Sequence, residues 1–243
     1  MQPSDITIRR MNLEDLKLAC EWAAKEGWNP GLHDAECFFA ADPQGYFIAE
    51  MNGKPVGTVS AVAYDNNFGF LGFYIVNQEL RQLGIGMKLC DTAFEYLGRR
   101  TMGADGVTAM LGKYATIGLK LAHNNARYEG IGAASDLQLT SLAHMPFQEL
   151  QRYDRRFFPA PRSAFLECWI SRPGTHALAV MDGAAITGYG VIRPCHRGFK
   201  IAPMFADTPQ IAEQLFTALS ACAAGQPIFL DIPCCNQEAQ ALV

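Results

Sequence analysis

The sequence has neither a long apolar run nor an excess of charge of one sign. No run of about 18 apolar residues is present that could span a bilayer as a helix. The polar segment from Met1 to Asn12 lacks the apolar core of a signal peptide. Lys and Arg number 20 and Asp and Glu number 24, and the net charge of −4 gives no electrostatic reason to expect nucleic acid or an anionic membrane as a partner. We therefore expect a cytoplasmic protein that binds neither.

Paired cysteine motifs are also absent. The eight cysteines are scattered and none forms a C-x-x-C pair. Adjacent Cys234 and Cys235 have poor geometry for clamping a metal ion. Because nothing indicates an oxidising compartment, we expect buried, reduced thiols and no metal site.

What the sequence does have is a globular composition with regular strand and helix patterns. Its 243 residues, 49% hydrophobic and 18% charged, suit one large domain or two compact ones. Asn52-Gly53 between two strand-like segments is the strongest two-residue hairpin signal, and Asn12 before two acidic residues indicates the start of a helix. In the first half these patterns predict strands at 5–12, 46–51, 55–64, 68–76 and 119–128, and helices that begin at Asn12 or span 34–40, 87–97 and 108–117.

The second half repeats the first at an offset of about 130 residues, which indicates two copies of one fold. Ile48–Gly53 aligns with Leu178–Gly183, including the hairpin turn. We predict domains at residues 1–135 and 145–243. At this offset the second copy ends before the counterpart of strand 119–128. It is therefore either C-terminally incomplete, as a truncated product would be, or its sheet edge is closed by another segment.

A glycine loop, Arg81–Gly86, lies between a predicted strand and a predicted helix. Glycines let the backbone come close to an anion, and the first N–H groups of a helix point at negative charge. The loop lacks the Gly-Lys-Ser/Thr of a Walker A motif. Its strand belongs to a hairpin-rich series, which argues against a Rossmann fold. A two-glycine turn of this kind is by itself as often structural as phosphate-binding.

The stretch from Ile75 to Gly86 resembles the acetyl-CoA motif of the GNAT N-acetyltransferase superfamily, a strand ending in V-x-x-x-x-R/Q-x-x-G-x-G/A. The order of elements over residues 5–130 is similar to that fold. The chain also resembles bacterial two-domain GNAT proteins with a degenerate C-terminal domain and a Glu-Gly-Trp-Asn-Pro-Gly segment, here Glu26–Gly31. The resemblance implies an α/β (α+β) fold of tandem GNAT-like domains, each a mixed, mostly antiparallel sheet flanked by helices.

The resemblance implies acetyl-CoA as co-substrate and no metal. In the family a deprotonated amine attacks the thioester directly, and a donor protonates the leaving thiolate. Tyr114, in a Y-x-x-x-G-L context, matches the tyrosine that often serves as this acid; the alternative is a core tyrosine with a hydrogen-bonded hydroxyl. Two sets of cofactor contacts carry over from the family. The backbone of Tyr74, Ile75 and Val76 would pair with the pantetheine arm. The pyrophosphate would be held by the motif residue Arg81 and by the N–H groups of Gln82, Leu83, Gly84, Ile85, Gly86 and Met87.

Two positions depart from the family pattern. Val107 stands where the family has an asparagine, and no glutamate lies at Leu71–Tyr74, where many relatives place a general base. Glu26 or Asp34 acting through water, and an amine that arrives neutral, are open alternatives.

In this fold the loop after the first helix overhangs the acceptor end of the cleft. Trp28, Asn29 and Asp34 are therefore candidate substrate-binding residues. Trp28 would stack on the acceptor or wall it off, and Asp34 would bind an ammonium group. The alternative is a rigid turn anchored by the tryptophan.

The second copy has no glycine where the loop would fall, at Ile211–Phe216, and Glu213 there would repel a pyrophosphate. We expect it to bind no acetyl-CoA and to shape the acceptor cleft or an interface. The predicted function is an N-acetyltransferase that moves an acetyl group from acetyl-CoA to a primary amine of a small molecule, peptide or protein. Open alternatives are a non-catalytic acyl-CoA-binding sensor or assembly protein and an amino-acyl or longer-acyl transferase. A homodimer is compatible with the sequence.

Overall fold

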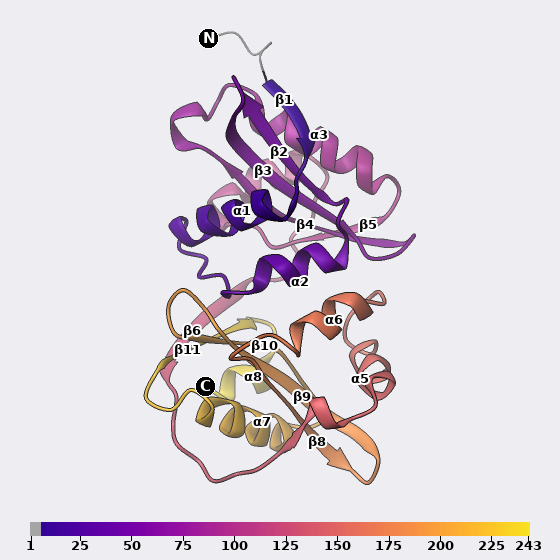
Figure 1. Cartoon of the computed structure of the whole chain (residues 1–243), viewed down its shortest axis with the longest axis vertical. Helices are drawn as coiled ribbons and strands as arrows, with labels where there is room; N and C mark the ends of the chain where they lie inside the picture. The colour runs from indigo at the N-terminus through magenta and orange to yellow at the C-terminus, as the bar shows by residue number, and fades with distance from the viewer. Residues whose placement is uncertain (1–5) are drawn as a thin grey trace. The chain divides into compact units, whose positions relative to one another are not determined.

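The structure is a computed structural model that describes residues 6–243. The chain forms two compact units (Figure 1). No helix in these described residues is long and apolar enough to cross a membrane. The first unit contains the chain up to Pro30, Asp34–Met110 and Ala160–Phe165, and the second contains Gly31–His33, Leu111–Pro159 and Leu166–Val243.

The first unit is built on a five-stranded sheet with strand order β1-β2-β3-β4-β5. Neighbouring strands are antiparallel except β4 and β5, which are parallel. This arrangement confirms the mixed, mostly antiparallel sheet. Its elements are β1 (Ile6–Arg10), α1 (Leu13–Lys25), α2 (Asp34–Ala41), β2 (Tyr46–Met51), β3 (Lys54–Ala63), β4 (Phe68–Val76), η2 (Gln78–Leu80), α3 (Ile85–Leu97), β5 (Thr101–Ala104) and η3 (Thr108–Met110).

Helices pack on both faces of this sheet, because successive side chains of a strand point to opposite sides. In β2, Tyr46 and Ile48 pack in one buried cluster with Leu16 of α1. Between them in the sequence, Phe47 belongs to a second cluster with Leu89 of α3. With α1 and α2 on one side and α3 on the other, the first four residues of the strand, Tyr46 to Ala49, are all apolar and buried.

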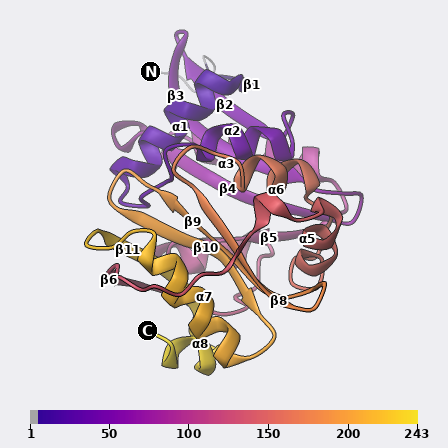
Figure 2. The same cartoon turned by 60° about the horizontal axis from the view of Figure 1, so that its bottom comes forward.

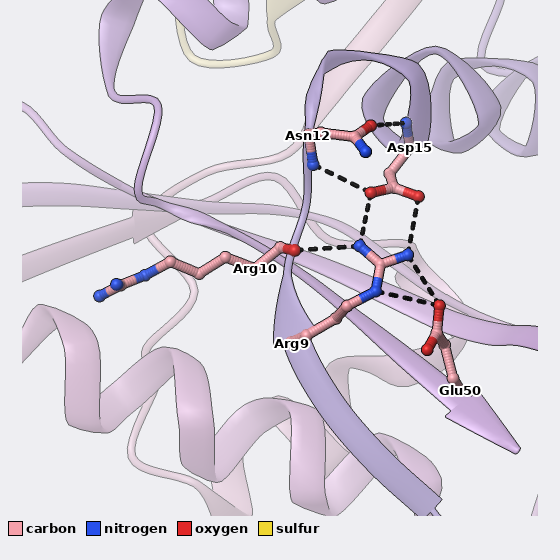
Figure 3. A network of polar contacts seen from close by, with 5 residues as sticks. All are labelled: Arg9, Arg10, Asn12, Asp15 and Glu50. Atoms are coloured by element: carbon pink, nitrogen blue, oxygen red, sulfur yellow. Dashed lines mark hydrogen bonds and ion pairs between the residues drawn. The ribbon is translucent and has the colours of Figure 1, made fainter. Parts of the chain in front are cut away.

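The Arg9 guanidinium ties the start of α1 to β2 (Figure 3). It donates to both carboxylate oxygens of Asp15, at 2.6 and 3.0 Å, and to Glu50 at 2.7 Å. The Asn12 and Asp15 side chains each accept the other's backbone N–H at 2.9 Å, which forms a capping box and confirms Asn12 as the cap. The hydrogen bonds from Arg9 lower the pKa of the Asp15 carboxyl.

The second unit is built on a six-stranded sheet with strand order β6-β11-β10-β9-β8-β7. Helix α7 covers one face (Figure 2), where Leu215 and Leu219 pack against Ile192, Ile201 and Ile228. The elements from residue 111 onward are α4 (Leu111–Thr116), β6 (Asn125–Ile131), β7 (Thr140–Ser141), η4 (Leu142–His144), α5 (Phe147–Asp154), α6 (Ser163–Trp169), β8 (His176–Asp182), β9 (Ala185–Pro194), β10 (Phe199–Ala206), α7 (Pro209–Ala221), β11 (Pro227–Pro233) and α8 (Gln237–Ala241).

Strand β6 corrects one prediction of the sequence analysis. A strand at 119–128 was expected to close the first sheet, within a domain at residues 1–135. The observed strand is Asn125–Ile131 and runs antiparallel to β11 of the second sheet along its whole length. Arg127 and Asp231 pair across these strands at 2.7 Å. The edge that the repeat leaves open in the second copy is therefore closed by another segment.

Candidate functional site

The C-terminal half of β4 carries a β-bulge and is not paired with its neighbour β5. Thr58 of β3 lies opposite Ile75 whereas Ser60 lies opposite Gly72, so β4 contains one extra residue there. Phe73 takes a φ of 44°, and its carbonyl accepts the Thr58 hydroxyl at 2.7 Å. Strand β5 pairs with β4 only up to Leu71. In the part of the chain that the structure describes, no strand lies beside the rest of β4 on this side.

The loop between β4 and α3 turns sharply at Gln82 and Gly84. Its entry is held by Asn77, whose N–H donates to the Val56 carbonyl at 3.0 Å. Gln82 and Gly84 have φ of 72° and 80°, and Gly84 stands directly before α3. A Cβ at Gly84 would meet no atom within 4 Å. Its backbone conformation, and not crowding, is therefore what favours glycine there.

Six consecutive backbone N–H groups, from Gln82 to Met87, are left without an acceptor within residues 6–243. The last three of these N–H groups lie in the first turn of α3. The first hydrogen bond inside the helix is donated by the Lys88 N–H to the Gly84 carbonyl at 3.2 Å. Unpaired N–H groups at a helix N-terminus carry partial positive charge and bind anions. The loop can therefore hold a phosphate or diphosphate through its backbone.

The Arg81 side chain braces the loop. Its Nε donates to the Val76 carbonyl at 3.1 Å, and its Nη2 pairs with the Glu26 carboxylate at 3.1 Å. Glu26 is the C-cap of α1. Arg81 therefore joins the end of β4 to the turn that follows α1. Sequence reasoning missed this ion pair, because 55 residues separate its members.

Tyr74 reaches from β4 to the first turns of α3. A Cβ built on Gly86 would lie 2.3 Å from the Tyr74 hydroxyl oxygen. This hydroxyl also hydrogen-bonds the Cys90 thiol, whose pKa is raised because burial outweighs that bond. The side chain of Tyr74 therefore packs under the start of the loop helix, in addition to the backbone contact predicted for it.

The predicted acceptor residues lie near Glu26 and at the start of α2. The Trp28 N–H donates to the Ala23 carbonyl at 3.0 Å, and Asn29 has a φ of 51°. Trp28 is half-buried. Asp34, the first residue of α2, is only 3% exposed. The tight turn at Asn29 is compatible with the structural alternative of a rigid turn, so substrate binding by these residues stays a prediction.

Tyr114 lies on the short helix α4, which belongs to the second unit, whereas the glycine loop belongs to the first. Its side chain is half-buried, and within the described residues no hydrogen-bond partner engages its hydroxyl. Val107, at the position where the family has an asparagine, is 44% exposed. The acid role of Tyr114 stays a prediction.

The repeat is visible in the packing of two glycines. Gly57 lies on β3 against Ile85 of α3, and Gly188 lies on β9 in the same way against Ile211 of α7. These matching contacts show that α3 and α7 occupy equivalent positions in the two copies. They also correct the alignment at an offset of 130, because Ile211–Phe216 is the counterpart of the helix and not of the loop.

The loop itself is shortened in the second copy. Residues 77–84 link the strand to the helix position of Ile85, whereas only residues 207–210 lead to the equivalent Ile211. The Thr208 side chain accepts the Ile211 N–H at 3.3 Å, and Pro209 has no N–H. The second copy thus lacks the open row of N–H groups of the first.

Comparison with known proteins gives a family for both halves. A family model described as "Acetyltransferase (GNAT) family" matches residues 12–114, and one described as "Acetyltransferase (GNAT) domain" matches residues 150–243. Each match falls on one of the two repeats.

Relatives match over two thirds or more of the chain. The chain is 29% identical to holothin acyltransferase of Pseudoalteromonas sp. (strain SANK 73390), over 93% of this chain and 79% of that protein. It is 25% identical to an uncharacterized N-acetyltransferase of Bacillus subtilis (strain 168), over 67% of this chain and 60% of that one. A crystal structure of a Pyrococcus horikoshii protein assigned as an acetyltransferase has the same fold, with a TM-score of 0.81 at 21% identity, and covers 98% of this chain and 83% of that one. The chain is therefore an acyltransferase of the GNAT family that carries two GNAT domains in tandem.

Proposed function

We propose that the chain transfers an acetyl group from acetyl-CoA to a primary amine of a small molecule, peptide or protein. The observation that carries this proposal is the row of unpaired N–H groups from Gln82 to Met87 at the start of α3. One such contact contributes about 0.3–1 kcal/mol when exposed, so several acting together suit a diphosphate. Beside this row, we assign the pantetheine arm to the backbone of Tyr74, Ile75 and Val76, in the half of β4 with which β5 does not pair.

The reaction needs one proton donor. The acceptor nitrogen attacks the thioester carbonyl carbon, the carbon–sulfur bond breaks, and the nitrogen loses a proton to a base or to solvent. We propose that the Tyr114 hydroxyl donates the proton that the leaving thiolate needs. A tyrosine hydroxyl can act as a general acid, and acid catalysis of this kind contributes about 10²–10⁴ in rate. Trp28, Asn29 and Asp34 are the residues proposed to face the acceptor.

Met87→Glu tests the cofactor site without disturbing the core. Met87 is 55% exposed in the first turn of α3. A carboxylate there repels a pyrophosphate, yet an acid in the first turn stabilises a helix by about 0.3–1 kcal/mol. We expect acetyl-CoA to bind about tenfold more weakly, a loss of about 1.4 kcal/mol, while the free energy of unfolding stays equal or rises. Titration calorimetry and denaturant unfolding measure the two effects.

The control is Gln214→Glu, which adds the same charge at an exposed position of α7 in the second copy. We expect it to leave binding unchanged, with one acetyl-CoA per wild-type chain. Equal affinity of the Met87→Glu variant and the wild type would rule out the loop as the pyrophosphate site. Two acetyl-CoA molecules per chain would show that the second copy binds too.

Tyr114→Phe tests the acid. We expect kcat to fall about 10²-fold or more while the Kd for acetyl-CoA changes little, measured with thiol detection across a panel of amines. A kcat within twofold of wild type would remove Tyr114 from the chemistry. Binding without turnover of any amine would favour the non-catalytic acyl-CoA-binding alternative.

A longer acyl donor is the second candidate, because one relative is named an acyltransferase and not an acetyltransferase. Comparing kcat/KM for acetyl-, butyryl- and hexanoyl-CoA on one amine decides between the two.

A further inference from the structure

Two of the cysteines depart furthest from the expectation of buried thiols. Cys234 and Cys235 are both exposed, whereas Cys20, Cys37 and Cys195 are buried. The pair follows β11 directly and has no role in the acyl-transfer site. Exposure makes both sulfurs accessible to small solutes, and their adjacency places two thiols within reach of each other.

The pair occupies the centre of a closed turn. The Asn236 N–H donates to the Pro233 carbonyl at 2.9 Å, so Cys234 and Cys235 are the two middle residues of a four-residue turn. Asn236 then caps α8 by accepting the Ala239 N–H at 3.0 Å. The turn is therefore fixed on one side by the last residue of β11 and on the other by the start of α8.

The backbone of Cys234 holds two other segments. Its N–H donates to the Asn124 carbonyl at 2.7 Å, and its carbonyl accepts the Gln240 side chain at 2.8 Å. Asn124 directly precedes β6. A change in the conformation of this turn therefore acts on the entry to β6 and on α8.

We propose that Cys234 and Cys235 are a reversible oxidation site that forms a disulfide between neighbouring residues when a peroxide is present. One thiolate attacks the peroxide, breaks its O–O bond and becomes a sulfenic acid, releasing hydroxide or an alkoxide that takes a proton from solvent. The second thiolate attacks the sulfenic sulfur, which forms the S–S bond and releases hydroxide. The two thiols lose two electrons and the peroxide gains them.

The geometry also makes such a bond easy to reduce. Adjacent Cα atoms lie about 3.8 Å apart across a trans peptide, closer than the roughly 4.4–6.8 Å of ordinary disulfides. Strained, exposed disulfides have higher reduction potentials and are the labile ones. Closing this bond changes the turn's backbone angles, which weakens the two hydrogen bonds of Cys234 and loosens residues 117–124.

The experiment treats the full chain with hydrogen peroxide, blocks remaining thiols, and measures intact and peptide masses. We expect the peptide with both cysteines to lose two hydrogen atoms and to recover them with dithiothreitol. Hydrogen exchange at residues 117–124 should rise about tenfold in the oxidised protein and return to its original rate on reduction. Cys234→Ser and Cys235→Ser should each abolish the reversible change. Cys222→Ser, at a half-buried thiol whose pKa is raised by burial, should not.

Three outcomes overturn the proposal. They are irreversible sulfinic acid at either cysteine as the main product, a disulfide between two chains in place of the internal one, and oxidation that leaves hydrogen exchange at residues 117–124 unchanged.

Discussion

At Gly86 the chain has no room for a side chain. A Cβ there would lie 2.3 Å from the Tyr74 hydroxyl oxygen and 3.2 Å from the ring carbon that carries it. We expect Gly86→Ala to destabilise the protein by about 1–3 kcal/mol through overpacking, although alanine is the better helix former by about 1 kcal/mol. Tyr74→Phe removes the clashing oxygen. In that background the cost of Gly86→Ala should fall close to zero, measured by denaturant unfolding of all four proteins.

If the losses of unfolding free energy caused by Gly86→Ala and by Tyr74→Phe simply add in the double variant, the Tyr74 hydroxyl is not what excludes a side chain at Gly86. Acetyl-CoA binding to the same four proteins separates two reasons for the glycine. A loss of affinity that persists after Tyr74→Phe has restored stability would identify close backbone approach to the pyrophosphate as the second reason.

Among the elements, those with local signals could be predicted from the sequence. Asn52 and Gly53 have φ of 52° and 70°, as the tight turn between β2 and β3 requires. Asn12 caps α1, and the apolar run of β4 has the predicted bounds. Strand β5, only four residues long with a glycine at its centre, had no such signal and was missed.

Features that depend on distant partners could not be read in this way. The loop at Arg81–Gly86 was found, but the bond from Arg81 to Glu26 joins side chains from separate elements. The shortened loop of the second copy was hidden for a different reason. The hairpin strands of the two copies align at an offset of about 130 residues, but the shorter loop before α7 changes the offset for the helix that follows. Only the contacts of Gly57 and Gly188 with the helices reveal this change.

For the whole molecule, β6 shows how a strand can be predicted while its partner is not. The sequence analysis predicts a strand at residues 119–128, but a strand can pair with any open edge of suitable register. The repeat indicated such an open edge in the second copy. Seven consecutive residues of β6 pair with β11, and Arg197 pairs with Glu129 in addition to the Arg127–Asp231 pair.

Two fragments of the chain test where β6 belongs. Residues 111–243 contain β6 and β11, whereas residues 136–243 leave β11 as an exposed edge, which invites aggregation. At about 0.5–1.5 kcal/mol net for each hydrogen bond, losing the strand removes several kcal/mol from a domain whose stability is about 5–15 kcal/mol. We expect the longer fragment to unfold cooperatively and the shorter one to aggregate or lack a transition, measured by thermal circular dichroism and sedimentation.

The fragments differ only in residues 111–135, so a peptide can supply the missing part. A synthetic peptide of residues 119–135 should restore a cooperative transition to the shorter fragment, because β6 brings its hydrogen bonds and Arg127 to β11. The same peptide with proline at Ala126 and Tyr128 should not, since proline cannot donate to a strand ladder. If residues 136–243 fold alone with the same midpoint as residues 111–243, the second copy does not need β6. The domain boundary near residue 135 would then stand as the sequence predicts.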